Sequence, residues 1–270
     1  MRIIRIAFTA ALLLCVSVLA SAQRQLTILH VNDTHSHIDP IATEGQIGGE
    51  IERAAFVDSV RLAEGRKNVL YLHAGDFSQG SSYFSILNGD LEIELLNAGG
   101  VDCVTLGNHE FDNGIEELSR RLSNLKAKAV CANYDFSGFE LGKHIQPYTI
   151  IRRAGRKIGV IGMLCNIYAM VDYKVSSKIP RLGEDADIIN KWADYLKNDQ
   201  KCDLVIVLSH MGYERDMELI PETGNVDLFV GGHSHTLLSR PGRAQDKDAH
   251  LVRVVQDWCW GRCVGVLKLN

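Results

Sequence analysis

The sequence predicts a protein of the α/β class, and three observations point to it. Short apolar runs rich in β-branched residues alternate with amphipathic stretches, which is the pattern of strands separated by helices. The 270 residues are 46% apolar and 23% charged, as in ordinary globular proteins. No repeat or Ser/Pro-rich linker interrupts residues 23–270, so we expect one domain with a sizeable core.

Eight apolar segments have the length and composition of strands, and five amphipathic stretches have those of helices. In chain order, we expect strands at Leu26–Val31, Val69–His73, Asp102–Leu106, Lys157–Gly162, Leu204–Ser209, Val226–Val230, Leu251–Gln256 and Val264–Leu269. We expect helices at Ile47–Leu62, Ser82–Asn97, Ile115–Leu125, Glu184–Lys197 and Glu214–Ile220. Each of the first three strands is followed by a helix, which is the order that defines the class.

Residues 1–22 predict an export signal. Two arginines precede an apolar run from Ile6 to Ala20, and Ala20-Ser21-Ala22 supplies a small-residue cleavage site. We therefore expect an exported protein, in the periplasm if the source is a Gram-negative bacterium and otherwise secreted. No later stretch reaches the roughly 18 apolar residues of a membrane span, so we expect none.

Charge and cysteine spacing exclude two classes of function. The formal net charge is −4, and loss of the two leader arginines makes it more negative, which argues against a nucleic-acid or membrane-surface binder. The cysteines show no C-x-x-C spacing, which argues against a cysteine zinc site. Cys259 and Cys263 either pair in an oxidising compartment or remain separate thiols.

Five polar clusters each follow the carboxyl end of a predicted strand, where ligands of α/β sheets bind. They are Asn32-Asp33-Thr34-His35, Gly75-Asp76, Gly107-Asn108-His109-Glu110, Ser209-His210 and Gly231-Gly232-His233-Ser234-His235. Their carboxylate, amide and imidazole side chains suffice for two divalent ions. Oxygen and nitrogen ligands without thiolate suit Mn, Zn, Fe or Co.

The order D-x-H, G-D, G-N-H-E, H, G-H-x-H resembles the calcineurin-like metallophosphatase superfamily. The longer strings NHEFDN at 108–113, SHMGY at 209–213 and GGHSHT at 231–236 resemble the catalytic domain of exported bacterial 5′-nucleotidases. The similarity runs from about Leu26 to the C-terminus. It implies a four-layer α-β-β-α sandwich in which two mixed β-sheets lie between helices.

The resemblance also implies a dinuclear metal centre. It assigns Asp33, His35 and His235 to one ion, assigns Asn108, His210 and His233 to the other, and makes Asp76 the bridge. Two divalent ions, two aspartates and a hydroxide leave a charge of about +1, which attracts phosphate. The implied reaction is attack of a metal-bound hydroxide on phosphorus.

His109 follows a predicted ligand, but the resemblance implies a different role. With Asn108 it contacts the substrate, and it assists departure of the leaving oxygen while Asp112 orients and charges it. A spacing of three lets both side chains face the cleft if the chain is helical there. Glu110 is expected to support the ligands.

The function implied is hydrolysis of nucleotide phosphomonoesters. A UDP-sugar pyrophosphatase, a 2′,3′-cyclic phosphodiesterase and a sulfur-ester hydrolase are alternatives on the same metals. A metal-binding protein or an inactive interaction subunit is the non-enzymatic alternative, against which the His109–Asp112 pair argues, because metal storage needs no histidine beside the cluster.

Substrate selection is expected to depend on a second component. The family's second, substrate-binding domain does not follow in this sequence, so we expect a second polypeptide or a second copy of the chain to supply it. Trp258 and Trp260 are expected to pack or to form an interface, in preference to stacking on a base. His30 and His73 are expected to be hydrogen-bonded core residues.

Overall fold

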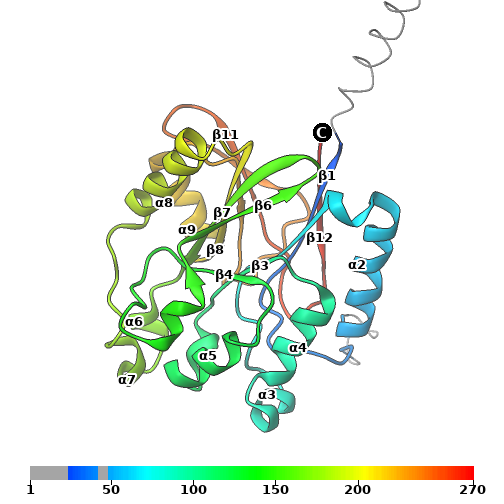
Figure 1. The fold of residues 1–270 in the computed structure, drawn as a ribbon, viewed down its shortest axis with the longest axis vertical. Coiled ribbons are helices and arrows are strands. Elements are labelled where there is room, and N and C mark those ends of the chain that lie inside the picture. The colour runs from blue at the N-terminus through cyan, green and yellow to red at the C-terminus, as the bar shows by residue number, and fades with distance from the viewer. Residues whose placement is uncertain (1–23, 42–47) are drawn as a thin grey trace, which may run out of the picture.

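Two six-stranded β-sheets pack face to face between outer layers of helices (Figure 1). The structure is a computed structural model and describes residues 24–41 and 48–270. The predicted leader therefore lies outside the described residues. Among the described residues, no helix has the length and apolarity needed to cross a membrane.

The first sheet has the strand order β12-β1-β2-β3-β4-β5. Its strands are parallel except β12, which runs antiparallel to β1 at one edge. Their bounds are β1 Leu26–Val31, β2 Val69–His73, β3 Cys103–Thr105, β4 Lys128–Val130, β5 Ile145–Gln146 and β12 Gly265–Leu269.

The second sheet has the order β10-β11-β9-β8-β7-β6, with four parallel strands in the middle and an antiparallel strand at each edge. Its strands are β6 Tyr148–Arg153, β7 Arg156–Leu164, β8 Leu204–His210, β9 Leu228–Val230, β10 Gly242–Gln245 and β11 Leu251–Val255. Both sheets are therefore mixed, as expected.

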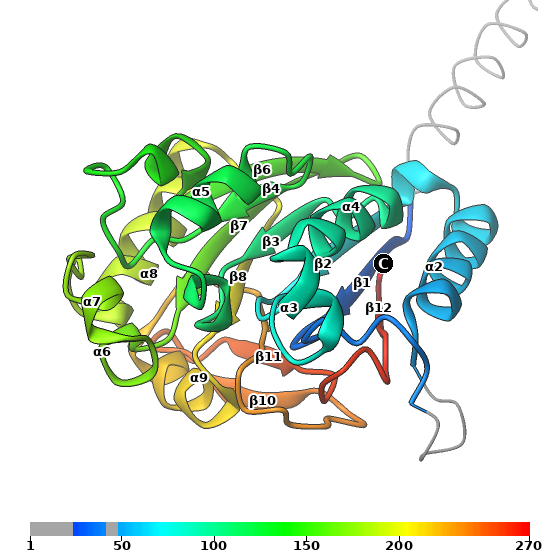
Figure 2. The same ribbon diagram turned by 90° about the horizontal axis from the view of Figure 1, so that it is seen from below.

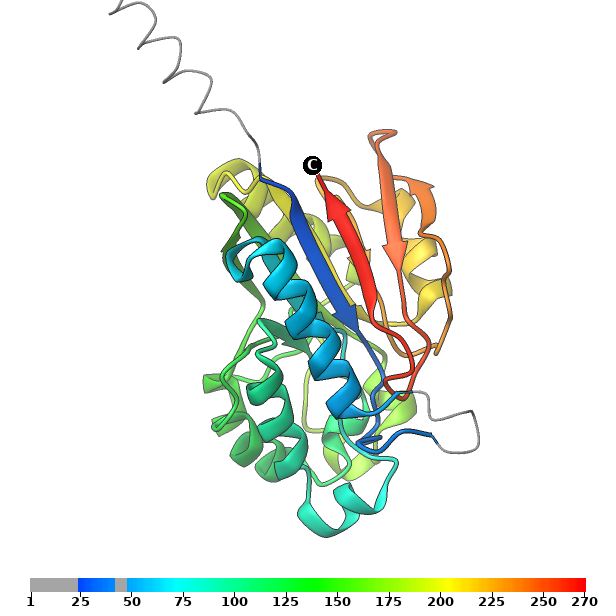
Figure 3. The same cartoon turned by 90° about the vertical axis from the view of Figure 1, so that its right-hand side faces the viewer.

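Helices cover the outer face of each sheet. Figure 3 shows α2 lying along the first sheet beside β1, and Figure 2 shows α4 and α5 over the same sheet, whereas α8 and α9 pack on the second sheet. The helix bounds are α2 Glu50–Glu64, α3 Ser82–Leu87, α4 Asp90–Gly99, α5 Ile115–Leu122, α6 Ile167–Met170, α7 Tyr173–Ser176, α8 Asp185–Asp194 and α9 Tyr213–Leu219.

Three apolar cores lie between the four layers, because successive side chains of a strand point to opposite faces. In β8, Ile206 and Leu208 face the first sheet, whereas Val205 and Val207 face α8 and α9. A third core joins the first sheet to its helices. Burial on both faces explains why the central strands are continuous apolar runs.

The predicted strands Leu26–Val31 and Val69–His73 have the observed bounds, but the single helix predicted at Ser82–Asn97 is wrong. The helix is interrupted between α3 and α4, where Asn88 has φ 51° and Gly89 has φ 86°. Left-handed residues end a helix, and asparagine and glycine adopt this conformation most easily. The helix expected at Glu184–Lys197 also ends early, in a π-helical turn over Tyr195–Asp199.

Four strands were not expected, namely β4, β5, β6 and β10. β4 and β5 contain three and two residues, too few for a periodic pattern. β10 has the sequence Gly-Arg-Ala-Gln and lies at an edge, where it pairs with β11 alone. Pairing with a neighbouring strand stabilises these segments more than their own β-propensity does.

Ile206→Ala should lower the free energy of unfolding by about 2–5 kcal/mol, because it opens a cavity between the two sheets. Ile206 has no exposed surface. The matched control is Ile86→Ala on α3, where the side chain is 74% exposed. Urea unfolding followed by circular dichroism measures both variants. Equal losses would contradict the description of the inter-sheet core.

Candidate metal centre

The seven predicted ligands lie at the edge where the carboxyl ends of both sheets meet. They follow or end five strands: Asp33 and His35 after β1, Asp76 after β2, Asn108 after β3, His210 at the end of β8, and His233 and His235 after β9. The two sheets are joined here, because His210 Nδ1 donates a hydrogen bond to the carbonyl oxygen of Ala74 over 2.6 Å. Residues as distant in sequence as Asp33 and His235 are thereby neighbours.

Asp33, His35 and His235 form one group of possible ligands, whose atoms lie within 4.8 Å of one another. The two Nε2 atoms of His35 and His235 are 3.1 Å apart. Nε2 of His235 lies 3.4 Å from Asp33 Oδ1. These three side chains are the set that the sequence assigned to the first ion.

Asp76, His210 and His233 form a second group, again within 4.8 Å. His210 Nε2 lies 3.1 Å from Asp76 Oδ2, and the same carboxylate oxygen lies 3.8 Å from His35 Nε2 of the first group. Asp76 therefore lies between the two groups, where a bridging ligand has to be.

Asn108 is held beside Asp76 by its neighbour, because the backbone N–H of His109 donates to Asp76 Oδ1 over 2.9 Å. The side-chain oxygen of Asn108 accepts a hydrogen bond from the Cys165 thiol at 3.7 Å. The carboxamide is buried and contributes an oxygen without adding negative charge.

The backbone of the centre is strained. Five of the seven predicted ligands have a positive φ although none is glycine: Asp33, His35, Asp76, His233 and His235, with values from 47° to 75°. Each such residue costs about 1–3 kcal/mol and persists only where its surroundings determine the conformation. Strain of this kind clusters at functional sites.

Two glycines permit the close approach of the segments. A Cβ on Gly232 would lie 2.5 Å from the Ala74 carbonyl oxygen and 2.9 Å from His210 Nδ1. A Cβ on Gly75, whose φ is +84°, would lie 2.7 Å from the same nitrogen. Any larger residue would push His210 away from Asp76.

The donor set fits divalent cations. His210 is fully buried and its Nδ1 is bonded to Ala74, while its Nε2 faces Asp76 Oδ2 at 3.1 Å without a hydrogen bond of normal geometry to any described residue. Bonding of one imidazole nitrogen to a carbonyl fixes the other as the free electron pair, which is the usual orientation of a metal-bound histidine. Imidazoles and carboxylates without thiolates are the donors that Mn, Zn, Fe and Co accept.

The electrostatics also favour positive charge. Burial opposes protonation of His210, but the carboxylates of Asp76 and Asp33 outweigh it and raise the pKa of this histidine to about 10. Hydrogen bonds to Asp33 and to Cys259 raise the pKa of His235 to about 10. Burial raises the pKa of Asp76, and the neighbouring imidazoles, led by His210, outweigh it and lower that pKa overall. The protons on His210 and His235 balance the charge of the Asp33 and Asp76 carboxylates. Bound cations can balance the same charge in their place.

His109 and Asp112 form the predicted pair. His109 Nδ1 lies 2.9 Å from Asp112 Oδ2, and both side chains are partly exposed. The 3₁₀ helix His109–Phe111 places them on one side of the chain. The hydrogen bond to Asp112 raises the pKa of His109. The His109 ring lies 5.2 Å from that of His35, at the border of the first group.

Glu110 fastens two ligand segments to each other. Its carboxylate accepts backbone N–H groups from Gly107 at 2.6 Å, Asp76 at 2.9 Å and Ser78 at 3.1 Å. The residue has no exposed surface. Burial and the nearby Asp76 charge raise the pKa of Glu110 to about 7. It lies where a supporting residue was expected.

Two supporting residues could not be found from the motifs. Gln256 accepts hydrogen bonds from Ser234 and Thr236 and donates to the carbonyl of Gly232, so it shapes the turn that carries His233. Asp216 accepts from Ser209 over 2.6 Å. Both sit outside the clusters in sequence, and only the position of Gln256 at the end of a strand offered a signal.

The neighbouring histidines behave as core residues. His30 Nδ1 lies 2.5 Å from Asp257, and His73 Nε2 lies 3.1 Å from the Thr34 hydroxyl. Both are buried, as expected. In the same region, Cys259 and Cys263 are separate thiols.

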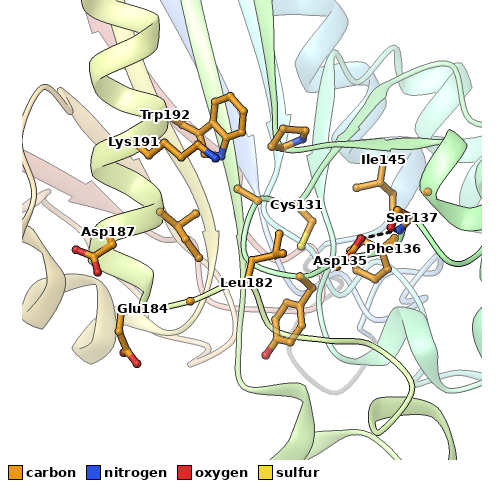
Figure 4. A pocket seen from close by; sticks show the side chains of 16 residues that line it. Cys131, Asp135, Phe136, Ser137, Ile145, Leu182, Glu184, Asp187, Lys191 and Trp192 are labelled. Carbon is orange, nitrogen blue, oxygen red and sulfur yellow. Dashed lines mark hydrogen bonds between the residues drawn. The ribbon is translucent and has the colours of Figure 1, made fainter.

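A cavity of about 550 Å³ lies elsewhere, between α8 and the segment that follows β4. In Figure 4, Trp192 of α8 stands on one side of it and Ile145 on the other. Its charged lining residues are Asp135, Glu184, Asp187 and Lys191. None of the seven predicted ligands lines it, and its excess of carboxylates disfavours phosphate. The cavity therefore does not compete with the metal centre as a phosphate site.

Comparison with curated proteins gives several 5′-nucleotidases among the relatives. The chain is 34% identical over 272 residues to a probable 5′-nucleotidase of Treponema pallidum and 30% identical over 269 residues to the NAD 5′-nucleotidase of Haemophilus influenzae. Each alignment covers 91% of this chain but only 45% and 44% of those proteins. The chain thus spans about half the length of the curated relatives it matches.

Solved structures agree. The fold matches a 5′-nucleotidase precursor from Thermus thermophilus with a TM-score of 0.84 at 31% identity, over 91% of this chain and 51% of that one. This likeness confirms the expected sandwich of two mixed sheets between helices. The calcineurin-like phosphoesterase profile matches residues 26–237, which contain all seven predicted ligands and the His109–Asp112 pair. The chain therefore belongs to the calcineurin-like phosphoesterase family.

Proposed function

We propose that the protein is a metal-dependent phosphoesterase that hydrolyses phosphomonoesters of nucleotides. The observation that carries the proposal is the pair of contiguous Asp/His groups that meet at Asp76, with His109 beside them. The names of the relatives, 5′-nucleotidases and an NAD 5′-nucleotidase, support a nucleotide substrate.

The proposed ligands keep their two groups. Asp33, His35 and His235 would hold one ion, Asn108, His210 and His233 would hold the other, and Asp76, whose carboxylate faces both groups, would contribute to both. When bound, two divalent ions lower the pKa of water and stabilise charge on the phosphoryl oxygens.

His109 is proposed to protonate the leaving oxygen. Asp112 accepts the hydrogen bond at Nδ1 and favours the protonated ring, so Nε2 can donate a proton to the alkoxide that departs. Asn108 and His109 together are proposed to contact the substrate phosphate. Partial exposure of His109 is consistent with access from solvent.

Base selectivity is proposed to come from a second polypeptide or a second copy of the chain. The tryptophans nearest the centre, Trp258 and Trp260, already stack on Arg262 at 4.2 Å each. Charge at the metal centre attracts phosphate but cannot distinguish adenine from uracil. An opposing wall with aromatic faces and hydrogen-bond donors supplies that discrimination.

Export is also proposed, with the periplasm as destination in a Gram-negative source. Its support is the leader sequence alone, with basic residues, an apolar run and a small-residue cleavage site.

Metal analysis after loading with manganese or zinc should give about two ions per chain. Asp76→Ala should lower occupancy of both sites, because it removes the proposed bridge, whereas Asp187→Ala at the rim of the distant cavity should leave it unchanged. Plasma emission spectrometry after dialysis measures the content, and circular dichroism checks the fold. One ion or none on a folded wild-type chain would refute the dinuclear centre.

His109→Ala should lower kcat by roughly 10²–10⁴-fold with metal content preserved, the range expected for loss of a general acid. The loss should be smaller for 4-nitrophenyl phosphate than for AMP, because nitrophenolate leaves without protonation. His250→Ala, on the exposed β10–β11 hairpin, is the histidine control. The acid role fails if both substrates lose the same factor.

The purified chain should hydrolyse AMP and UMP with kcat/KM values within about tenfold of each other, because a metal centre that binds phosphate does not distinguish the bases. A UDP-sugar, a 2′,3′-cyclic nucleotide and a sulfur ester belong in the same panel, because faster turnover of one of them would reassign the substrate. Sedimentation on the same sample gives the oligomeric state. Selective turnover of one nucleotide by a monomer would contradict the partner proposal.

A further inference from the structure

The loop between β11 and β12, residues 257–263, is bound to the segment that carries Asp33. Asn32 Nδ2 donates to the Trp258 carbonyl oxygen over 2.6 Å, and the Trp260 N–H donates to the Asp33 carbonyl oxygen over the same distance. The Asp257 N–H donates to Asn32 Oδ1 over 2.8 Å. Three hydrogen bonds thus connect this loop to the first metal-binding motif.

The side chains of the loop form a stack. The Arg262 guanidinium carbon lies 4.2 Å from the ring centroids of both Trp258 and Trp260. On its far side, Trp260 stacks on His37 with centroids 4.8 Å apart and an interplanar angle of 12°. His37 Nδ1 in turn hydrogen-bonds the carbonyl oxygen of His35 over 2.9 Å. The stack therefore reaches a second proposed ligand of the same ion.

A contact beside the third ligand runs through Trp258, whose backbone N–H donates to the carbonyl oxygen of Thr236, the residue after His235, over 3.0 Å. An Arg262 N–H also lies 3.6 Å from the sulfur of the buried Cys259. The loop thus contacts the segments that carry all three ligands of one group, whereas His210 and Asp76 of the other group are held by Ala74 and Glu110.

The loop is strained where it makes these contacts. Trp258 and Trp260 have φ values of 60° and 61°, and Gly261 has 63°. A bulky residue seldom adopts the left-handed region, and two of them in one short loop require compensation from their surroundings. A cation between two aromatic faces supplies such compensation, because each ring attracts it electrostatically.

We propose that the Trp258–Arg262–Trp260 stack is a positioning element for the ion bound by Asp33, His35 and His235. It holds the loop in its strained form, and the loop holds these three ligands in register. The inference rests on the proposed metal centre. It assigns Arg262 an indirect role, and the ion affected is the one whose ligands the stack reaches.

The test is a calorimetric titration of the metal-free chain with manganese or zinc. Arg262→Met, which keeps the length and removes the charge, should weaken one of the two ions by roughly 10–100-fold, the usual effect of losing a residue that supports a ligand. Arg262→Lys keeps a cation between the rings and should restore most of the affinity. The control is Lys191→Met, which removes a similar stack on Trp192 of α8, at 4.8 Å, and should change neither ion.

A second background identifies the ion. In a His35→Ala chain, the remaining ion is the one proposed for Asp76, Asn108, His210 and His233, and Arg262→Met should alter its affinity less than about threefold. If Arg262→Met fails to fold, as judged by circular dichroism, Trp260→Leu, which removes one aromatic face, takes its place with the same selective weakening expected.

The outcomes separate the inference from the proposed function. A wild-type chain that fails to bind two ions refutes the proposed centre itself. Two wild-type ions with unchanged affinities in Arg262→Met overturn the inference alone. Equal weakening of both ions also overturns it, since that result describes a general loss of structure and not the positioning of one ligand group.

Discussion

The metal centre depends on bringing two buried carboxylates together, because Asp33 and Asp76 repel each other when ionised in a desolvated site. Two features oppose this repulsion. Imidazole side chains face both carboxylates, and a strained backbone holds the two aspartates in place. Glu110 and Gln256, which bind backbone groups of the ligand loops, supply the rigidity that lets the strain persist.

The division of labour among these residues follows from their chemistry. Glu110 is acceptor-only when ionised, so it gathers three N–H groups from two loops. Gln256 both donates and accepts, so it can bind a carbonyl on one side of a turn and an N–H on the other. The ligands themselves are short or planar side chains at strand ends, where little rotamer freedom is lost on binding an ion.

The side chains that the motifs select lie together in the structure, whereas several elements of the fold around them were not predicted. Motifs such as Asp33-x-His35 are recognised by their residue types. A strand such as Leu26–Val31 is recognised by its mainly apolar sequence. The break at Asn88 was missed because the amphipathic pattern continues across it. Asp216 could not have been found, since its partner Ser209 becomes a neighbour only when α9 packs on the sheet. Contacts of this kind depend on tertiary structure and produce no periodic pattern in the sequence.

The hydrogen bond from His210 to Ala74 has a mechanical meaning. It crosses from the second sheet to the first, and the two ligand groups likewise draw on strands of both. Other hydrogen bonds cross between the sheets as well, among them those of the Asn133 side chain with the backbone of Leu164 and that of Arg153 with the carbonyl oxygen of Val69. Ions at the proposed centre would add links of another kind, since their ligands follow strands of both sheets. Binding of metal would therefore also oppose movement of one sheet over the other.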